Sequence, residues 1–274
     1  MVLLIGGHAR SGTTMLWKLC NQHPDIRLTY EFREFYALGK PFREYEHEML
    51  EHMRYRGIYE NRVLGLPDTS NKLLRGMNIL SGYGFAARYL FGLRRYRMAP
   101  IDSAAVEATL KGLFPHARVV GDKYPNYVFM LDKLTGIDGL SCLIIYRDCR
   151  DVTSSTLRRV RTDWRNKPWA TGINTAEKVA TQWVRAVELM EHYADRIKMT
   201  RYEDLIQQPE LELEALGNWL GVDPSGFPKE LIRDASIGNY KSGLTDEELT
   251  SVMKIAGPAM ARLRYVAPGP IGGL

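Results

Sequence analysis

The sequence is poor in cysteine and has no long apolar run. Its three cysteines, Cys20, Cys142 and Cys149, have a spacing that fits neither a disulfide framework nor a zinc site, which favours a reducing environment. No apolar run approaches the roughly twenty residues of a membrane-spanning helix. The apolar residues 2–5 end at Gly6, too soon for a signal peptide. We therefore expect a cytoplasmic protein without a transmembrane segment.

Acidic residues are absent from one long stretch, residues 69–101. The wider segment 32–100 contains twelve Lys and Arg against seven Asp and Glu, so it accounts for the whole net charge of +5. This excess favours an anionic partner. Nucleic acid is not expected, because the sequence contains no recognised nucleic-acid-binding module.

Short apolar runs alternate with helical patterns along most of the chain. Strands separated by helices predict a parallel sheet covered by helices on both faces, an α/β fold with three αβα layers. The 274 residues are expected to form a single domain. The predicted strands are residues 2–5, 26–29, 117–120, 140–146 and 197–200.

Residues 32–100 interrupt this alternation. Residues 42–56 and 69–91 are predicted to be helices, the second one interrupted by its glycines, so the segment is expected to be a helical insertion. Residues 162–174 are expected to form a loop or lid, and a glycine-containing tail is expected after the last short helix at 228–234.

A glycine-rich loop joins the first predicted strand to the first helix. Such a loop, together with a helix N-terminus, favours bound anions. Gly7, Gly12 and Thr14 fit the pattern of a nucleotide-binding P-loop, but Thr13 occupies the lysine position. That lysine contacts the β- and γ-phosphates of ATP. The loop is therefore P-loop-like and predicts a site for a phosphate ester without a triphosphate, with Arg10 as its cation.

A second anion-binding pattern follows the most apolar predicted strand. Arg147 leaves the end of that strand, and Ser154 and Ser155 lie on the next predicted helix. A guanidinium donates two parallel hydrogen bonds to a phosphate, and serine hydroxyls add further donors. These side chains therefore predict a second phosphate site.

The two patterns together resemble sulfotransferases that use 3′-phosphoadenosine 5′-phosphosulfate (PAPS). The loop and the following His23-Pro24-Asp25 are most similar to the tyrosylprotein and bacterial branches. The resemblance implies that Arg147 and Ser155 hold the 3′-phosphate of PAPS and of its product, adenosine 3′,5′-bisphosphate. It implies that the 5′-phosphosulfate is held by Arg10, Ser11, Gly12, Thr13 and Thr14.

Two further donor contacts are implied by the resemblance. Tyr202 would lie near the adenine. The alternative is that Tyr202 only packs in the core. Lys241 lies in a segment that closes over the donor in the family, and a solvated loop lysine is the alternative.

The candidate general base follows the second predicted strand. In an open parallel sheet, ligands meet the carboxyl ends of the strands, where Glu31 lies. The tyrosylprotein branch has its base in Gly-Glu-Glu-Thr-Arg, whose second glutamate and arginine match Glu31 and Arg33. The resemblance therefore implies that Glu31 is the base and that Arg33 contacts the substrate. The alternative is that Glu31 only forms an ion pair with Arg33. His8, in the donor loop, is the rival base and a second substrate contact.

The segment Asp122-Lys123-Tyr124-Pro125 matches the Asn-Lys-Asp-Pro of the family in part. The resemblance implies that Lys123 acts with Arg10 on the bridging oxygen of the donor. Asp122 replaces the asparagine of the family. The family needs no metal, and the sequence shows no cluster of metal ligands.

The acceptor is predicted only as a class. Residues 83–98, basic and aromatic, shape the acceptor side or form a solvated helical hairpin. The acceptor hydroxyl would belong to a peptide or protein tyrosine, a small or carrier-bound molecule, a glycan, or a lipid, which would give peripheral membrane contact. One alternative is a P-loop-type small-molecule kinase, which the missing lysine disfavours. Another is a non-catalytic nucleotide-binding module, which Glu31 and Lys123 disfavour.

Overall fold

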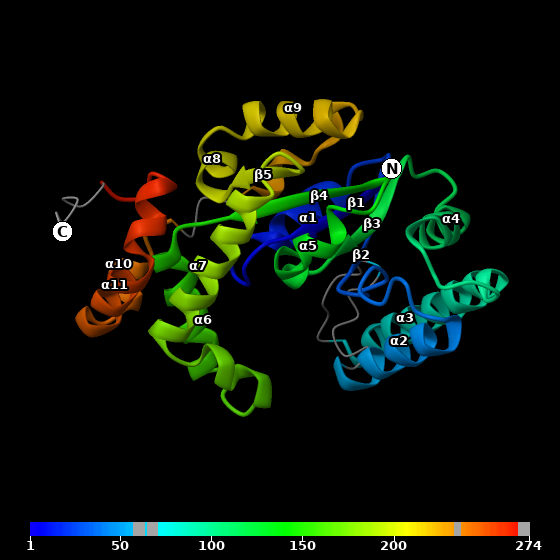
Figure 1. Cartoon of the computed structure of the whole chain (residues 1–274), viewed down its shortest axis with the longest axis horizontal. Helices are drawn as coiled ribbons and strands as arrows, with labels where there is room; N and C mark the ends of the chain where they lie inside the picture. Colours follow the sequence, from blue (N-terminus) through cyan, green and yellow to red (C-terminus); the bar gives the residue numbers. More distant parts are fainter. Residues whose placement is uncertain (57–63, 65–70, 233–236, 268–274) are drawn as a thin grey trace.

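The computed structural model describes residues 1–56, 64, 71–232 and 237–267. In this part of the chain, five strands form one parallel sheet in the order β2-β3-β1-β4-β5 (Figure 1). β1 is the middle strand, and all of its residues are buried. The strands are β1 (Val2–Gly6), β2 (Ile26–Tyr30), β3 (Val119–Lys123), β4 (Leu140–Tyr146) and β5 (Ile197–Arg201).

Helices cover both faces of the sheet, which confirms the predicted α/β fold. Leu3 and Ile5 of β1 point to one face, where α1 (Thr13–Asn21), α8 (Tyr202–Gln207) and α9 (Pro209–Leu220) pack. Val2 and Leu4 point to the other face. That face packs against α2 (Phe42–Arg56), α3 (Lys72–Leu93), α4 (Ser103–Leu113), α5 (Leu131–Leu134) and α7 (Ala176–His192).

A third apolar cluster joins α7 to α6 (Cys149–Arg161) and α11 (Asp246–Arg262). The predicted glycine-containing tail was therefore wrong for residues 246–262, which form a helix of 17 residues. Its N-terminus carries a capping box, in which the Thr245 hydroxyl and the Glu248 carboxylate each bind the backbone N–H of the other residue. The remaining short helices are η2 (Arg94–Tyr96), η3 (Pro125–Met130), η4 (Pro168–Ile173), η5 (Pro224–Gly226), η6 (Lys229–Leu231) and α10 (Tyr240–Gly243).

The third strand lies further along the chain than predicted. It begins at Val119 and runs through Lys123, so Asp122 and Lys123 lie inside the sheet rather than after it. Both side chains are fully buried. Gly121 permits this position, because a Cβ there would collide with the carbonyl oxygen of Leu3 on β1.

Within residues 32–100, α2, α3 and η2 are helical and residues 32–41 are not, and α3 is continuous where an interruption was predicted. Each glycine in a helix costs about 1 kcal/mol relative to alanine. Burial of Phe85 and Tyr89 on α3 offsets this cost, because both rings pack edge-to-face on Phe32. Among the described helices, none is long and apolar enough to cross a membrane.

Candidate active site

The loop after β1 opens α1 without a side-chain cap. Gly12 is the N-cap residue, with a φ of 101°, a conformation that favours glycine. A Cβ at Gly12 would also lie 2.5 Å from the ring of Tyr202. The Ser11 N–H donates to the His8 carbonyl at 3.0 Å, which closes the loop. This arrangement leaves the first turn of α1, from Thr13, in a position to bind an anion.

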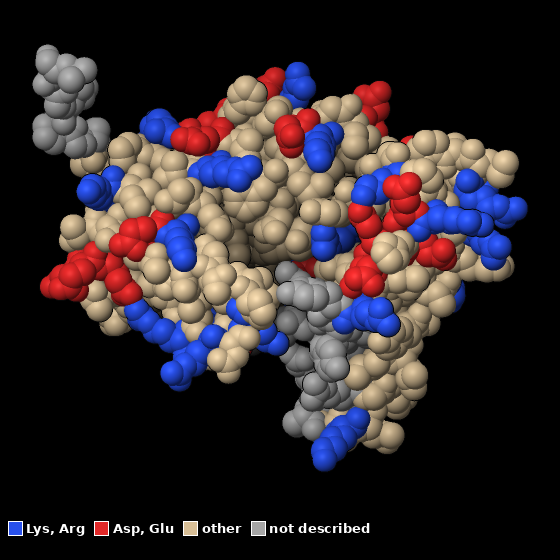
Figure 2. Space-filling model, turned by 60° about the horizontal axis from the view of Figure 1, so that its bottom comes forward, with Lys and Arg blue, Asp and Glu red and all other residues tan. Residues whose placement is uncertain are grey.

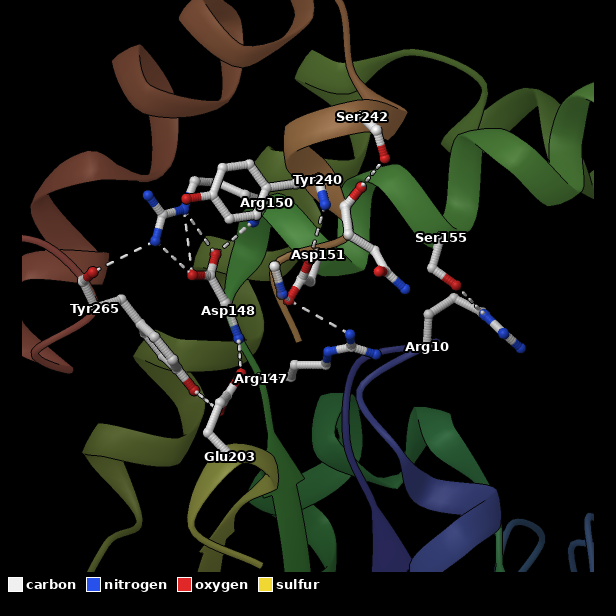
Figure 3. A network of polar contacts seen from close by, with 12 residues as sticks. Arg10, Arg147, Asp148, Arg150, Asp151, Ser155, Glu203, Tyr240, Ser242 and Tyr265 are labelled. Carbon is white, nitrogen blue, oxygen red and sulfur yellow. Dashed lines mark hydrogen bonds and ion pairs between the residues drawn. The ribbon is translucent and has the colours of Figure 1, made fainter. Parts of the chain in front are cut away.

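Arg10 concentrates positive charge beside this loop. Its Nε donates to the Ser155 hydroxyl at 3.0 Å, which joins the loop after β1 to α6 (Figure 3). Burial, followed by the positive charges of Arg159, Arg158 and Arg147, lowers the pKa of Arg10 from its ordinary value. A bound anion would relieve this repulsion between guanidinium groups.

A buried hydroxyl supports the same interpretation. The Ser11 Oγ is buried and has no hydrogen-bond partner among the described residues. Buried polar atoms in folded proteins normally have a partner. Ser11, Arg10 and the uncapped start of α1 therefore fit a phosphate or sulfate group.

Arg147 and Ser155 lie at the same edge of the sheet but make different contacts. Arg147 Nη2 is 3.4 Å from Asp151 Oδ2, and its guanidinium lies 4.4 Å from the ring centroid of Tyr202 (Figure 3). Ser155 accepts its hydrogen bond from Arg10. The buried ring of Tyr202 thus packs between Gly12 and Arg147.

Asp151 also ties the C-terminal part of the chain to α6. Its carboxylate accepts hydrogen bonds from the backbone N–H groups of Gly238, at 2.8 Å, and Tyr240, at 3.0 Å. This places α10 beside the site, with Lys241 exposed on it. The sequence did not single out Asp151 for this role, because its partners lie more than eighty residues away.

A second polar network lies behind Arg147 (Figure 3). Arg150 pairs with Asp148 at 2.6 Å and lies over the ring of Tyr240. Glu203 accepts from the backbone N–H of Asp148 at 3.1 Å and from the Tyr265 hydroxyl at 2.8 Å. The network connects the start of α6 and the first turn of α8 with the segment that follows α11.

The candidate base is paired with the candidate lysine. Lys123 Nζ donates to Glu31 Oε1 at 2.8 Å, and their side chains are 1% and 14% exposed. The ammonium also lies 3.4 Å from the ring centroid of Tyr30. The Tyr30 hydroxyl is 3.1 Å from the Thr14 hydroxyl. Tyr30, which the sequence did not single out, therefore links Lys123 to the donor loop.

Glu31 and Arg33 belong to a strained turn. Their φ values are 54° and 68°, in the left-handed region that costs about 1 kcal/mol or more for such residues. The Asp122 carboxylate compensates by accepting the backbone N–H groups of Phe32, at 3.2 Å, and Arg33, at 3.0 Å. The Glu31 N–H donates to the Lys123 carbonyl at 2.7 Å. Asp122 and β3 thus set the direction of the Glu31 side chain.

A second buried acid lies next to Asp122. The Thr29 hydroxyl is 2.6 Å from Glu34 Oε1 and 2.9 Å from Asp122 Oδ1. The Tyr127 hydroxyl donates to Asp122 at 2.8 Å. Burial, followed by the charge of Asp122, raises the pKa of Glu34 well above its usual range. We infer that Glu34 holds a proton. Burial also raises the pKa of Asp122, although the hydrogen bonds from Tyr127, Thr29 and the Arg33 N–H lower it.

Arg33 forms the wall of a pocket next to this turn. Its Nη1 is 2.9 Å from His52 Nδ1, and its guanidinium lies 3.8 Å from the ring centroid of Tyr36. His52 Nε2 lies 2.8 Å from the Glu31 carbonyl, so His52 donates there and accepts from Arg33. The pocket has a volume of about 410 Å³ and also includes Met49. Figure 2 shows that this side of the molecule has a hollow at its centre, with Lys and Arg side chains on both sides of it.

His8 is buried in the donor loop, 4% exposed, with Nδ1 2.8 Å from the Ala9 carbonyl. Burial lowers the pKa of His8 to about 4. His8 is therefore neutral near pH 7, and a base with such a low pKa takes up a proton less readily than one tuned near the working pH. Among the described residues, no group of three or more His, Cys, Asp or Glu could hold a metal ion.

Comparison with known proteins identifies the family. Residues 3–225 match the model of the "Sulfotransferase family". No curated protein matches the sequence. The sulfotransferase domain of the Synechococcus PCC 7002 olefin synthase has a similar structure, with a TM-score of 0.57 and 16% identity, covering 98% of this chain and 95% of that one.

Two more solved structures share the fold. The sulfotransferase domain of the curacin biosynthetic pathway has a TM-score of 0.55 and 14% identity, covering 98% of each chain. The sulfotransferase of Alicyclobacillus acidocaldarius has a TM-score of 0.50 and 18% identity, covering 96% of this chain and 94% of that one. The family match extends over most of the chain, and the chain therefore belongs to the sulfotransferase family.

Proposed function

We propose that this enzyme transfers the sulfuryl group to an acceptor hydroxyl whose proton is taken up by Glu31. The observation that carries the proposal is the Lys123–Glu31 ion pair at 2.8 Å, at the edge where the strands of the sheet end. The buried ammonium fixes the carboxylate, and the 14% exposure of Glu31 lets an acceptor reach it. A general base must lie within hydrogen-bond reach of the proton that it removes.

PAPS supplies the sulfuryl group when it is bound. Arg10, Ser11 and the start of α1, with Thr13 and Thr14, would hold its 5′-phosphosulfate, because the Ser11 hydroxyl and the cluster of guanidinium groups fit an anion. Arg147 and Ser155 would hold the 3′-phosphate.

Two residues have a weaker claim to the donor. Tyr202 would border the adenine from its position between Gly12 and Arg147, although its burial in the core also fits a packing role. Lys241, exposed on α10, is the candidate for closing over the phosphates.

The ion pair gives Lys123 a second task. When Glu31 takes up a proton it becomes neutral, and the ammonium 2.8 Å away is no longer balanced by that charge. A buried positive charge can then stabilise negative charge that develops nearby. We propose that Lys123 and Arg10 share this task.

The pocket beside the turn is the proposed acceptor site, bordered by α2 from the segment 32–100. Its volume of about 410 Å³ lies in the range of small-molecule sites. Arg33 forms no ion pair with a described carboxylate, and its Nε is buried without a hydrogen-bond partner. We therefore propose a hydroxyl acceptor that carries an anionic group, from a peptide or protein tyrosine, a small molecule, a lipid or a glycan.

The substitution Glu31→Gln tests the proposal. We expect turnover to fall about 10²- to 10⁴-fold, the usual contribution of a general base, because the amide cannot accept the proton. Turnover would be read as release of adenosine 3′,5′-bisphosphate from PAPS with a panel of phenols, sugars and long-chain alcohols. Calorimetry should show unchanged affinity for adenosine 3′,5′-bisphosphate.

The matched control is Glu214→Gln, which changes an exposed glutamate on α9, outside the pocket. It should turn over as the wild type does. Wild-type turnover by the Glu31 variant would rule out Glu31 as base, and loss of turnover in His8→Gln alone would assign the role to His8.

A further inference from the structure

Helix α3 has an apolar surface on two opposite sides. One side packs into the core: Tyr89 and Leu93 are fully buried, and the Tyr89 hydroxyl is 2.7 Å from that of Tyr45 on α2. This side fixes α3 to the rest of the protein. The helix lies at the periphery of the molecule (Figure 1).

The opposite side of α3 is apolar and exposed. Large apolar residues recur there at spacings of three, four and eleven, which place them on one face of a helix. The face spans 18 helical positions, about 27 Å at 1.5 Å per residue. Its members, called the α3 stripe here, are Leu73, Met77, Leu80 and Phe91, which are 74%, 55%, 71% and 80% exposed.

The charges on α3 and in the turn after it have a single sign. No acidic residue occurs from residue 69 to residue 101. Arg88, Arg94 and Arg97 are exposed towards the C-terminal end of the helix and in the turn after it, followed by Met98, which is 89% exposed. The surface of α3 and the turn after it therefore combines exposed apolar side chains with positive charge.

We propose that α3 docks this enzyme on an anionic lipid surface. The α3 stripe would lie at the boundary between headgroups and acyl chains, and the arginines would contact the headgroups. This inference concerns binding and does not depend on the proposed function. A bilayer accommodates a convex helical ridge without a complementary groove.

A second copy of this chain fits the same surface less well. A twofold contact places the same patch on both sides of an interface. Residues 69–101 contain no acid to oppose the arginines of the other copy. An acidic protein would pair with the arginines of α3, but it would need a groove that accommodates the α3 stripe.

The test is co-sedimentation of the full-length enzyme with vesicles of phosphatidylcholine alone or with phosphatidylglycerol, at low and high salt. We expect binding to the anionic vesicles only, weakened by salt. The double change Leu80→Ser and Phe91→Ser should weaken it about tenfold or more. Arg94→Gln with Arg97→Gln should weaken it about thirtyfold, since each cation near an anionic leaflet contributes about fivefold.

Each variant has a control elsewhere on the surface. Leu211→Ser changes a residue that is 58% exposed on α9, and Lys133→Gln with Lys254→Gln removes two exposed charges. Both controls should bind like the wild type. Circular dichroism and thermal unfolding would establish that the variants fold, and the salt dependence of the wild type tests the proposal without any substitution.

Three results would overturn the proposal. The first is absence of binding to every vesicle, and the second is equal binding by wild type and both variants. The third comes from sedimentation equilibrium without lipid: a dimer that dissociates in the Leu80 and Phe91 variant would assign the α3 stripe to a second copy.

Discussion

The proposed donor side and the proposed acceptor side meet at one edge of the sheet but are built differently. The proposed 5′-phosphosulfate site takes its anion-binding groups from one short loop and the helix start that follows it, and Arg10 joins it to Ser155, 145 residues away. The acceptor side depends on partners distant in sequence: the Arg33 N–H is held by Asp122, 89 residues away. The 5′-phosphosulfate part of the donor side is thus set mainly by the local chain, and the acceptor side by buried side chains.

This difference implies that the two sides respond differently to substitution. Changes on the acceptor side should affect turnover more than donor binding, because they move Glu31. Changes on the donor side should affect donor binding or loop stability.

After Glu31→Gln, the largest expected effect is that of Lys123→Met. It removes the buried cation beside Glu31, and loss of one such electrostatic contact costs up to about 10³-fold in turnover, about 4 kcal/mol. Affinity for adenosine 3′,5′-bisphosphate, measured by calorimetry, should change little. Lys133→Met, at an exposed site on α5, is the control. Equal losses of turnover and donor affinity would show that the donor side and the acceptor side do not respond differently to substitution.

Acidification should destabilise the donor loop through His8. The folded protein keeps this residue neutral down to about pH 4, whereas the unfolded chain protonates it near pH 6.5. Neutral His8 therefore contributes to the free energy of unfolding above pH 6.5. This contribution, about 3 kcal/mol, is lost as the pH falls to about 4.

Urea unfolding of wild type and His8→Gln between pH 7 and pH 4 measures this contribution. The difference in free energy of unfolding between wild type and His8→Gln should become smaller on acidification, because only the wild type loses the contribution of the neutral His8. His47→Gln, at an exposed position, is the control. If this difference in free energy of unfolding stayed constant from pH 7 to pH 4, His8 would not be held neutral by burial.

A smaller effect is expected for Asp122→Asn. Its amide would turn N–H groups towards donors that now face a carboxylate, which should destabilise the protein by about 2 kcal/mol. Turnover should fall about tenfold as the turn of Glu31 loosens, without a change in affinity for adenosine 3′,5′-bisphosphate. Asp132→Asn, exposed on α5, is the control. Unchanged turnover at full stability would show that Asp122 does not position the base.

The smallest effect is expected for Ser155→Ala. Loss of one hydrogen-bond partner for Arg10 should weaken binding of adenosine 3′,5′-bisphosphate about fivefold, or about 1 kcal/mol. Turnover at saturating PAPS should remain. Ser225→Ala, exposed on η5, is the control in the same calorimetric titration. Unchanged affinity would refute the assignment of Ser155 to the 3′-phosphate.

The contrast between the two sides also explains what the sequence could predict. The layers of the fold, the loop after β1 and a helix that carries Ser154 and Ser155 follow from short-range patterns, and the structure contains all three. The pairing of Glu31 with Lys123 depends on the register of β2 with β3, where Tyr30 lies opposite Lys123. A single sequence does not reveal that register, so the contact was not predicted.

Tertiary packing explains the elements that were predicted wrongly. Glycines suggested a break in α3, but its buried aromatic face keeps the helix continuous. Gly257 and Pro258 obscured α11, although the capping box at Thr245 and Glu248 was present in the sequence. The loop or lid predicted at 162–174 contains η4, and its role as a lid stays a prediction.

The strand order has a consequence for biosynthesis. β1 leaves the ribosome before the other strands of this sheet and is its middle strand, yet its neighbours β3 and β4 begin only at Val119 and Leu140. The apolar residues 2–5 must therefore stay unpaired while more than a hundred further residues are translated, and such distant pairing folds slowly and exposes chains to aggregation. Nascent chains of this enzyme should consequently depend on chaperones until β4 has been synthesised.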